Sequence, residues 1–237
     1  MLGALVQTYN EVIAPLILKG GPIVAVLLLV SVVAVAVIIV KIVQFYMAGI
    51  YASTRSRART IEPVLDLVRA GDFTSAQNLV AAQKGPLARL MEAGLIASWR
   101  DHRRDTEIEE ELGRVGGNQL VAMQSYFRWL EVIGNIAPLL GLLGTVMGMI
   151  TAFQQLEVAG SKVDPSILAG GIWEALLTTE VGLIVAIPVV TILNLLENRL
   201  DQYRQEMRDV SARMMHALHS AEKRASVNMA PKPQAAQ

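Results

Sequence analysis

The stretch GIWEALLTTEVGLIVAIP, residues 171–188, places two glutamates, Glu174 and Glu180, inside a run that is otherwise apolar. The uncharged part, from Val181 to Leu193, is too short to cross a hydrocarbon core of about 30 Å at about 1.5 Å per helical residue. A helix that spans a membrane here must therefore begin near Ile167. The sequence predicts two carboxyl groups at membrane depth.

Two more uncharged runs lie earlier in the chain, at residues 22–40 (PIVAVLLLVSVVAVAVIIV) and 132–153 (VIGNIAPLLGLLGTVMGMITAF). Each is long enough to cross a membrane as a helix. Of the 237 residues, 53% are hydrophobic and 18% are charged, a composition typical of membrane proteins. We predict an all-α integral membrane protein with three transmembrane helices.

Lysine and arginine predict the orientation, because positive residues near the ends of spans stay on the cytoplasmic side. Basic residues follow the first span, precede the second and follow the third, and they are Lys41, Arg55, Arg57, Arg59, Arg114, Arg128, Arg199, Arg204, Arg208 and Arg213. Only Lys19 and Lys162 lie near the opposite ends. The N-terminus is therefore expected outside and the C-terminus in the cytoplasm.

The cytoplasmic part is expected to be helical, with apolar residues at helical spacing between Gly and Pro breakers. We expect the helix that starts near Asp105 to run on into the second span, and the third span to continue into a long amphipathic helix. The predicted segments are 1–21 periplasmic, 22–46 first transmembrane helix, 47–129 cytoplasmic helical domain, 130–156 second transmembrane helix, 157–166 short periplasmic loop, 167–196 third transmembrane helix, 197–224 cytoplasmic helix and 225–237 disordered tail.

Small residues recur on one side of the second span and on one side of the third. They are Gly134, Ala137, Gly141, Gly144, Gly148 and Ala152 in the second, and Gly171, Ala175, Thr178, Gly182 and Ala186 in the third. Such stripes allow helices to approach closely in membranes. Pro188 is expected to kink the third span and free a carbonyl group one turn earlier.

Glu174 lies only about 40° from Thr178 around the helix, at the edge of this small, polar stripe. Counted inward from Phe153 and Ile167, Thr145 and Glu174 are expected at the same depth on antiparallel neighbours. A charged group near the centre of a span costs roughly 2.5–3.5 kcal/mol, so acids at this depth usually have a function. A carboxyl group that binds and releases a proton is one interpretation, and a static one that is hydrogen-bonded to a neighbouring helix is the other.

Glu180 lies about 120° from Glu174, beside Trp173. We expect its carboxyl group to be neutral and bonded to another helix of the same subunit, with Ser31 as one candidate partner. The chain has no cysteine and its formal net charge is zero, so neither a thiolate metal site nor a nucleic-acid partner is indicated. The three histidines, His102, His216 and His219, lie in polar stretches and are expected to be solvated. No metal site is predicted.

The segments GNIAPLLGLLGTVMGMITAF and ILAGGIWEALLTTEVGLIVAIPVVTILNLL resemble the paired membrane signature of the TolQ, ExbB and MotA proton-channel family, and the three-span layout is most similar to ExbB or TolQ. By position, Glu174 matches the family's membrane glutamate, and Thr145 and Thr179 match its pore-facing threonines. Thr178 remains the candidate from helical geometry. Glu180 departs from the small residue that is common there in ExbB-like sequences.

The resemblance implies a homopentamer in the bacterial inner membrane, surrounding a dimer of a single-span partner similar to ExbD or TolR. It implies that H⁺, or Na⁺ as the alternative, passes through and drives work on a TonB-like or TolA-like envelope protein in outer-membrane transport. No cofactor is implied.

Three alternatives were weighed. A membrane-embedded hydrolase is disfavoured because no histidine lies in any span. A passive scaffold would need the glycine stripes but not Glu174. Outer-membrane maintenance of the TolQ kind, or motility, would use the same membrane machinery for a different client.

Overall fold

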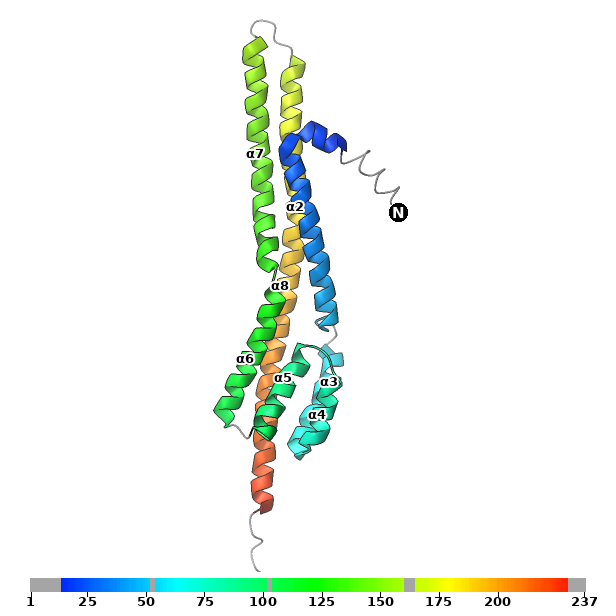
Figure 1. Ribbon diagram of the computed structural model, residues 1–237, viewed down its shortest axis with the longest axis vertical. Coiled ribbons are helices and arrows are strands. Elements are labelled where there is room, and N and C mark those ends of the chain that lie inside the picture. Colours follow the sequence, from blue (N-terminus) through cyan, green and yellow to red (C-terminus); the bar gives the residue numbers. More distant parts are fainter. Residues whose placement is uncertain (1–13, 52–53, 102–103, 160–164, 230–237) are drawn as a thin grey trace, which may run out of the picture. The chain divides into compact units, whose positions relative to one another are not determined.

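The computed structural model describes residues 14–51, 54–101, 104–159 and 165–229 (Figure 1). Its elements are α2 (Ala14–Met47), α3 (Thr54–Ala70), α4 (Phe73–Ala81), α5 (Pro86–Leu95), a π-helical turn η2 (Ile96–Arg100), α6 (Asp105–Gln124), α7 (Phe127–Ala159) and α8 (Pro165–Met229). These residues form helices and turns and no strand, which confirms the all-α class. The expectations for residues 1–13, for residues 160–164 of the external loop and for residues 230–237 fall outside the described residues.

Three regions are long and apolar enough to cross a membrane, Gly20–Met47, Asp105–Val158 and Leu168–Arg224. They contain the three predicted spans, and this confirms a multi-pass membrane protein. Many large apolar side chains on α2, α7 and α8 are exposed in the single chain, among them Leu29, Leu139 and Ile187. Exposed apolar surface of this extent belongs in contact with lipid or with other membrane helices.

The chain forms two compact units, one made of residues 1–41 and 126–196 and the other of 42–125 and 197–237. The first unit holds the spans, and its limits lie close to the predicted ends of the membrane segments. The second unit holds the short helices and the last part of α8. The two units are described separately below.

In the first unit, α2 contains a sharp kink at Gly21, whose φ of 63° and ψ of −165° are not helical. Glycine tolerates this left-handed region because it has no Cβ. Pro22 follows directly, and proline is suited to the first position of a helix because it has no N–H to leave unpaired. α2 therefore bends near its start, and the long helix after the bend begins at Pro22; the bend is visible in Figure 1.

The helix expected to run from Asp105 into the second span is interrupted. α6 ends at Gln124, Ser125 is extended with φ −50° and ψ 141°, and Tyr126 has a positive φ of 68°. The Ser125 hydroxyl donates a hydrogen bond to the carbonyl oxygen of Ala122, at 2.8 Å, which occupies an acceptor left open by the end of the helix. The expectation of an unbroken helix was therefore wrong.

In contrast, α8 is a single helix from Pro165 to Met229 and passes through Pro188 without a break in assignment. Residues 225–229, expected in the tail, continue this helix. In the second unit this helix is amphipathic, as expected, and its buried side consists of Leu200, Tyr203, Met207, Val210 and Met214.

The second unit packs the short helices into a hydrophobic core. Apolar residues at helical spacing in these helices are buried, and they include Val64, Leu65, Val68, Leu87, Leu90, Met91 and Leu95. Asp72 caps the start of α4 by accepting a hydrogen bond from the backbone N–H of Ser75, at 3.0 Å. Arg213 on α8 forms an ion pair with Glu62 on α3.

Candidate functional site

Helices α7 and α8 approach each other closely at their glycines. A Cβ added to Gly141 would lie 3.0 Å from the carbonyl oxygen of Thr178, and one added to Gly182 would lie 2.7 Å from that of Ala137. A Cβ on Gly148 would lie 3.1 Å from the Cβ of Ala175. Side chains larger than hydrogen would therefore force the two backbones apart. We call this contact the glycine seam, and it consists of Gly141, Gly144 and Gly148 on α7 with Gly171 and Gly182 on α8.

Pro188, grouped with these residues in the sequence analysis, is exposed and lies outside the glycine seam. α8 runs on through Pro188 as one helix, and the predicted kink stays a prediction.

The seam sets the register of the two helices. Gly144 packs against Thr178, Gly148 against Ala175 and Gly171 against Ala152. Thr145 therefore lies level with Thr178, while Glu174 lies level with Gly148, about one helical turn away. The expectation that Thr145 and Glu174 share one depth was wrong, because it assumed that Phe153 and Ile167 mark the same level.

The threonine hydroxyl groups are held by backbone carbonyl groups. Thr178 and Thr179 both donate hydrogen bonds to the carbonyl oxygen of Gly141 on the other helix, at 3.2 and 3.0 Å. Thr178 also reaches the carbonyl oxygen of Ala175, at 2.7 Å, and Thr145 that of Leu142, at 2.7 Å. Thr178 is only 3% exposed and belongs to the glycine seam, whereas Thr145 and Thr179 are half-buried. Thr145 and Thr179 are thus more accessible than Thr178.

Glu174 is exposed on α8 and faces the kink of α2. A Cβ on Gly21 would lie 3.4 Å from Oε1 of Glu174. Within the described part of the chain, no other residue forms a hydrogen bond or ion pair with this carboxylate. A carboxyl group at membrane depth without such a partner must find its stabilising contacts in water or in neighbouring chains.

Glu180 is also exposed, and it lies on a different side of α8 from Glu174. The hydrogen bond expected between Glu180 and Ser31 is not formed in the described residues. Trp173, which neighbours Glu180 on the helix surface, is exposed as well. This side of α8 is therefore open in the single chain.

Lys41 is a site that sequence reasoning placed wrongly. It was counted with the basic residues that follow the uncharged run 22–40, but its side chain is fully buried, within the helix predicted over residues 22–46. Its Nζ lies 5.4 Å from the ring centroids of both Tyr126 and Phe127, at the start of α7. Aromatic faces stabilise a buried ammonium group by cation–π attraction. Lys41 is followed in the sequence by the apolar residues Ile42 and Val43, and this context gives no sign of the contact.

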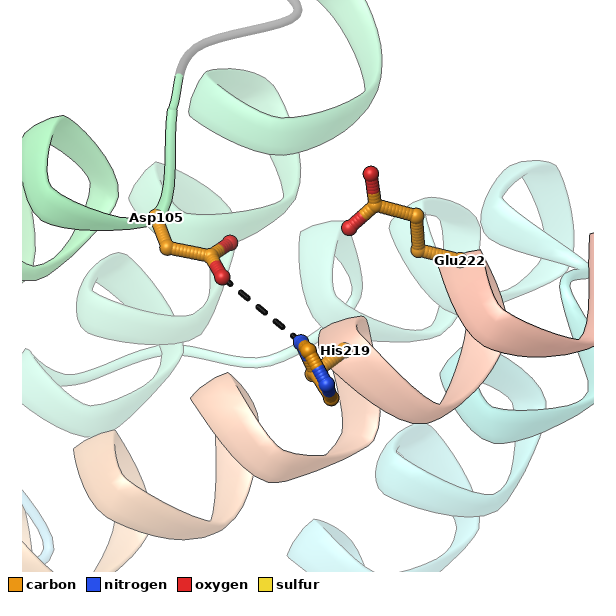
Figure 2. A group of neighbouring side chains, drawn as sticks. All are labelled: Asp105, His219 and Glu222. Atoms are coloured by element: carbon orange, nitrogen blue, oxygen red, sulfur yellow. Dashed lines mark ion pairs between the residues drawn. The ribbon is translucent and has the colours of Figure 1, made fainter. Parts of the chain in front are cut away.

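One group of possible metal ligands lies in the second unit, formed by Asp105, His219 and Glu222 (Figure 2). Nδ1 of His219 lies 3.6 Å from a carboxylate oxygen of Asp105, and the ligand atoms of the three residues lie within 4.8 Å of one another. Ligands of a zinc ion at about 2.1 Å would be roughly 3.4 Å apart in a tetrahedral site. All three side chains are exposed, so the group fits a solvated ion pair, as expected for His219.

The fold and the seam define a multi-pass helical membrane protein with an acidic residue and half-buried threonines in its spans. Residues 82–209 match the model of the MotA/TolQ/ExbB proton channel family, and this stretch contains α7, Glu174 and both threonine positions. The chain belongs to the MotA/TolQ/ExbB proton channel family. This family comprises channel and transport components rather than enzymes.

Several curated proteins are similar to this chain. It is 36% identical over 110 residues to biopolymer transport protein exbB1 of Vibrio cholerae, which covers 46% of this chain and 47% of that protein. It is 31% identical over 201 residues to biopolymer transport protein ExbB of Salmonella typhimurium, covering 80% and 77%. It is 38% identical over 87 residues to ExbB of Pseudomonas putida, covering 36% and 26%. The chain thus spans about half or less of the Vibrio and Pseudomonas proteins and about three quarters of the Salmonella protein.

Proposed function

We propose that this protein is the ion-conducting subunit of an inner-membrane motor that converts ion-motive force into work on an envelope protein. The observation that carries the proposal is Glu174, an exposed carboxyl group on a membrane-spanning helix, with Gly21 of α2 beside it. H⁺ is the proposed ion and Na⁺ the alternative, and neither a metal nor another cofactor takes part.

The exposure of Glu174 supports an assembly of several subunits. A charged group near the centre of a span costs roughly 2.5–3.5 kcal/mol when it faces lipid. In a closed ring of subunits, the same side chain would face a central passage instead. Exposed apolar residues on α7 and α8, such as Leu142 and Leu176, supply surface for contacts between copies. The proposed assembly is a homopentamer.

Thr145 and Thr179 are proposed to line the ion pathway with Glu174, because their half-buried hydroxyl groups lie at the surface of the α7–α8 pair. Thr178, which was also a candidate, is proposed to act mainly within the glycine seam, where its hydroxyl group is already bonded. The seam holds α7 and α8 as one rigid wall. A rigid wall would keep the few polar groups of the pathway at fixed positions.

The proposed partner is a dimer of a single-span protein of the ExbD or TolR kind, with a membrane carboxylate that takes up the ion. Neutralising this carboxylate changes which subunit of the pentamer the partner helix prefers. Successive steps would rotate the ring relative to its partner. Because five subunits surround two partner helices, all orientations would differ little in free energy. The work would be delivered to a TonB-like or TolA-like protein for outer-membrane transport.

The proposed location is the bacterial inner membrane, with the N-terminus in the periplasm and the C-terminus in the cytoplasm. The basic residues of the second unit support this orientation, because they flank the same ends of all three spans. The names of the relatives, which describe biopolymer transport, favour the uptake branch of the family. Outer-membrane maintenance or motility would be the alternative branches.

A passive scaffold is the second candidate, and the glycine seam favours it, since close helix packing alone explains the seam. A scaffold does not require an acid at residue 174. The test is to replace Glu174 by Ala and by Gln and to measure energy-dependent transport and assembly with the partner. The exposed Glu110 on α6, replaced by Gln, is the matched control. Loss of transport with intact assembly supports a channel, and full transport in both Glu174 variants rejects it.

A further inference from the structure

A cavity of about 340 Å³ lies inside the first unit, next to Glu174. Its walls come from all three spanning helices: the kink of α2 with Gly20 to Ile23, one side of α7 from Gly144 to Gln155, and the start of α8 from Ser166 to Thr178. At about 30 Å³ per molecule, this volume holds roughly ten waters. The cavity is thus large enough for a hydrated path within one subunit.

Polar groups line this cavity at the end away from the middle of the spans. Thr151, Gln155 and Ser166 contribute hydroxyl and amide groups, and Glu174 contributes its carboxylate. The remaining wall is largely glycine, so little side-chain bulk fills the space. Water enters a cavity only if several polar partners are available, and here four polar side chains provide them.

The kink of α2 borders the cavity next to the carboxylate of Glu174. Gly21 has a left-handed backbone, and a Cβ there would lie 3.4 Å from Oε1 of Glu174. Because Gly21 has no side chain, the carboxylate faces open space and backbone at this point. A helix that ran straight through residue 21 would not place its backbone in this position beside the carboxylate of Glu174.

We propose that this cavity is the route by which the transported cation, with water, reaches Glu174 from the outer side, so that each subunit carries its own entrance. Gly21 on α2 and Thr151 on α7 both line this entrance. The inference rests on the proposed function, since it assumes that ions are carried past Glu174. It goes further by assigning entry to the space enclosed by α2, α7 and α8 of one subunit.

The test uses the absence of cysteine in the natural sequence. Thr151→Cys is made as the cavity variant and Gln155→Cys as a second one, since either alone could disturb folding. Val158→Cys, at a highly exposed position near the outer end of α7 and outside the cavity, is the labelling control. Each assembled complex is treated from the outer side with a positively charged, membrane-impermeant methanethiosulfonate reagent.

We expect the reagent to label the cavity variants and to lower transport by about tenfold, because a fixed positive charge repels cations in the entrance. Labelled Val158→Cys should transport as before. Full transport after complete labelling of both cavity variants would contradict the proposal that the cavity is the entrance. The proposal would also be contradicted if both variants fold but neither reacts with the reagent.

Glu174→Gln is measured in parallel to separate the two proposals. If Glu174→Gln abolishes transport while the labelled cavity variants remain fully active, the result supports the proposed ion-conducting function and contradicts the proposed entrance. If Glu174→Gln transports normally, the proposed function itself fails, whatever the labelling shows.

Discussion

The single hydroxyl proton of Thr178 is shared between the carbonyl oxygen of Gly141 across the glycine seam, at 3.2 Å, and that of Ala175 in its own helix, at 2.7 Å. Thr179 reaches the same Gly141 oxygen from the next position, at 3.0 Å. One carbonyl group of α7 thus accepts two hydroxyl groups from α8. Glycine at residue 141 makes this possible, because any side chain there would push the backbones apart.

This pairing predicts the effect of removing each hydroxyl group. Thr178→Val keeps the shape but loses both hydrogen bonds in a buried position, so it should destabilise the folded protein by about 1 kcal/mol. Thr179→Val, in a half-buried position, should cost less stability. The measurement is thermal unfolding in detergent. Equal melting temperatures for the wild type and Thr178→Val would show that the bonds across the seam contribute nothing.

Close approach at the seam predicts a larger effect for Gly182→Ala. The new Cβ would lie 2.7 Å from the carbonyl oxygen of Ala137, which is backbone and cannot rotate away. We expect a loss of roughly 1–3 kcal/mol in stability, typical of overpacking. Gly113→Ala is the control, because a Cβ there meets nothing within 4 Å. If Gly182→Ala is as stable as Gly113→Ala, the close approach of the two backbones at the glycine seam is contradicted.

The seam could be predicted from sequence because it depends only on spacing. Small residues at steps of three and four fall on one side of any helix, so Gly141, Gly144 and Gly148 could be grouped without a structure. The depth of Glu174 relative to Thr145 could not be predicted in this way. Register depends on where two helices touch, and the estimated span ends gave a register that was wrong by about a turn.

Contacts between segments that are distant in the sequence could not be predicted either. Gly21 and Glu174 are about 150 residues apart, and the pattern GGP signals a break in a helix without indicating what lies beside it. Lys41 looked like a flanking positive charge because its contacts with Tyr126 and Phe127 depend on residues about 85 positions later, just after a break that was not foreseen. Exposure of Glu180 was missed because a helical wheel cannot say which side is covered.

Gly21 provides a further prediction. Gly21→Ala forces a side chain into a left-handed backbone and places its Cβ 3.4 Å from the Glu174 carboxylate. Transport should fall, while the assembly with the partner remains. Ion-driven transport and co-purification of the partner are the two measurements. The idea fails if Gly21→Ala transports as well as Gly113→Ala in the same membranes.

Asp72 offers a prediction about pH in the second unit. Hydrogen bonds from Ser75, first from its side chain and then from its backbone, hold the pKa of Asp72 below its usual value of 3.8. A carboxyl group with a lowered pKa in the folded state stabilises the protein above its unfolded pKa, and this contribution is lost as the pH falls through the folded pKa. Asp72→Ala should therefore lower the melting temperature at pH 7, and the difference should shrink below about pH 4.

Asp72→Asn separates charge from capping, because asparagine also caps a helix but does not titrate in this range. Neither Asn nor Ala titrates at residue 72, so the melting temperatures of both variants relative to the wild type should change by similar amounts between pH 7 and acid pH, while Asp72→Asn should lose less stability than Asp72→Ala at every pH. A constant gap between Asp72→Ala and the wild type across the whole range would contradict the lowered pKa.

The final prediction concerns Lys41, whose ammonium group lies 5.4 Å from both the Tyr126 and Phe127 rings. If cation–π attraction holds the first span to the start of α7, then Lys41→Met and Phe127→Leu should not be additive. A double-mutant cycle by thermal unfolding should give a coupling free energy of about 0.5–2 kcal/mol. Lys41→Arg keeps the charge and should retain much of the coupling. Strict additivity of Lys41→Met and Phe127→Leu would mean that the buried charge is stabilised by other contacts of Lys41 instead.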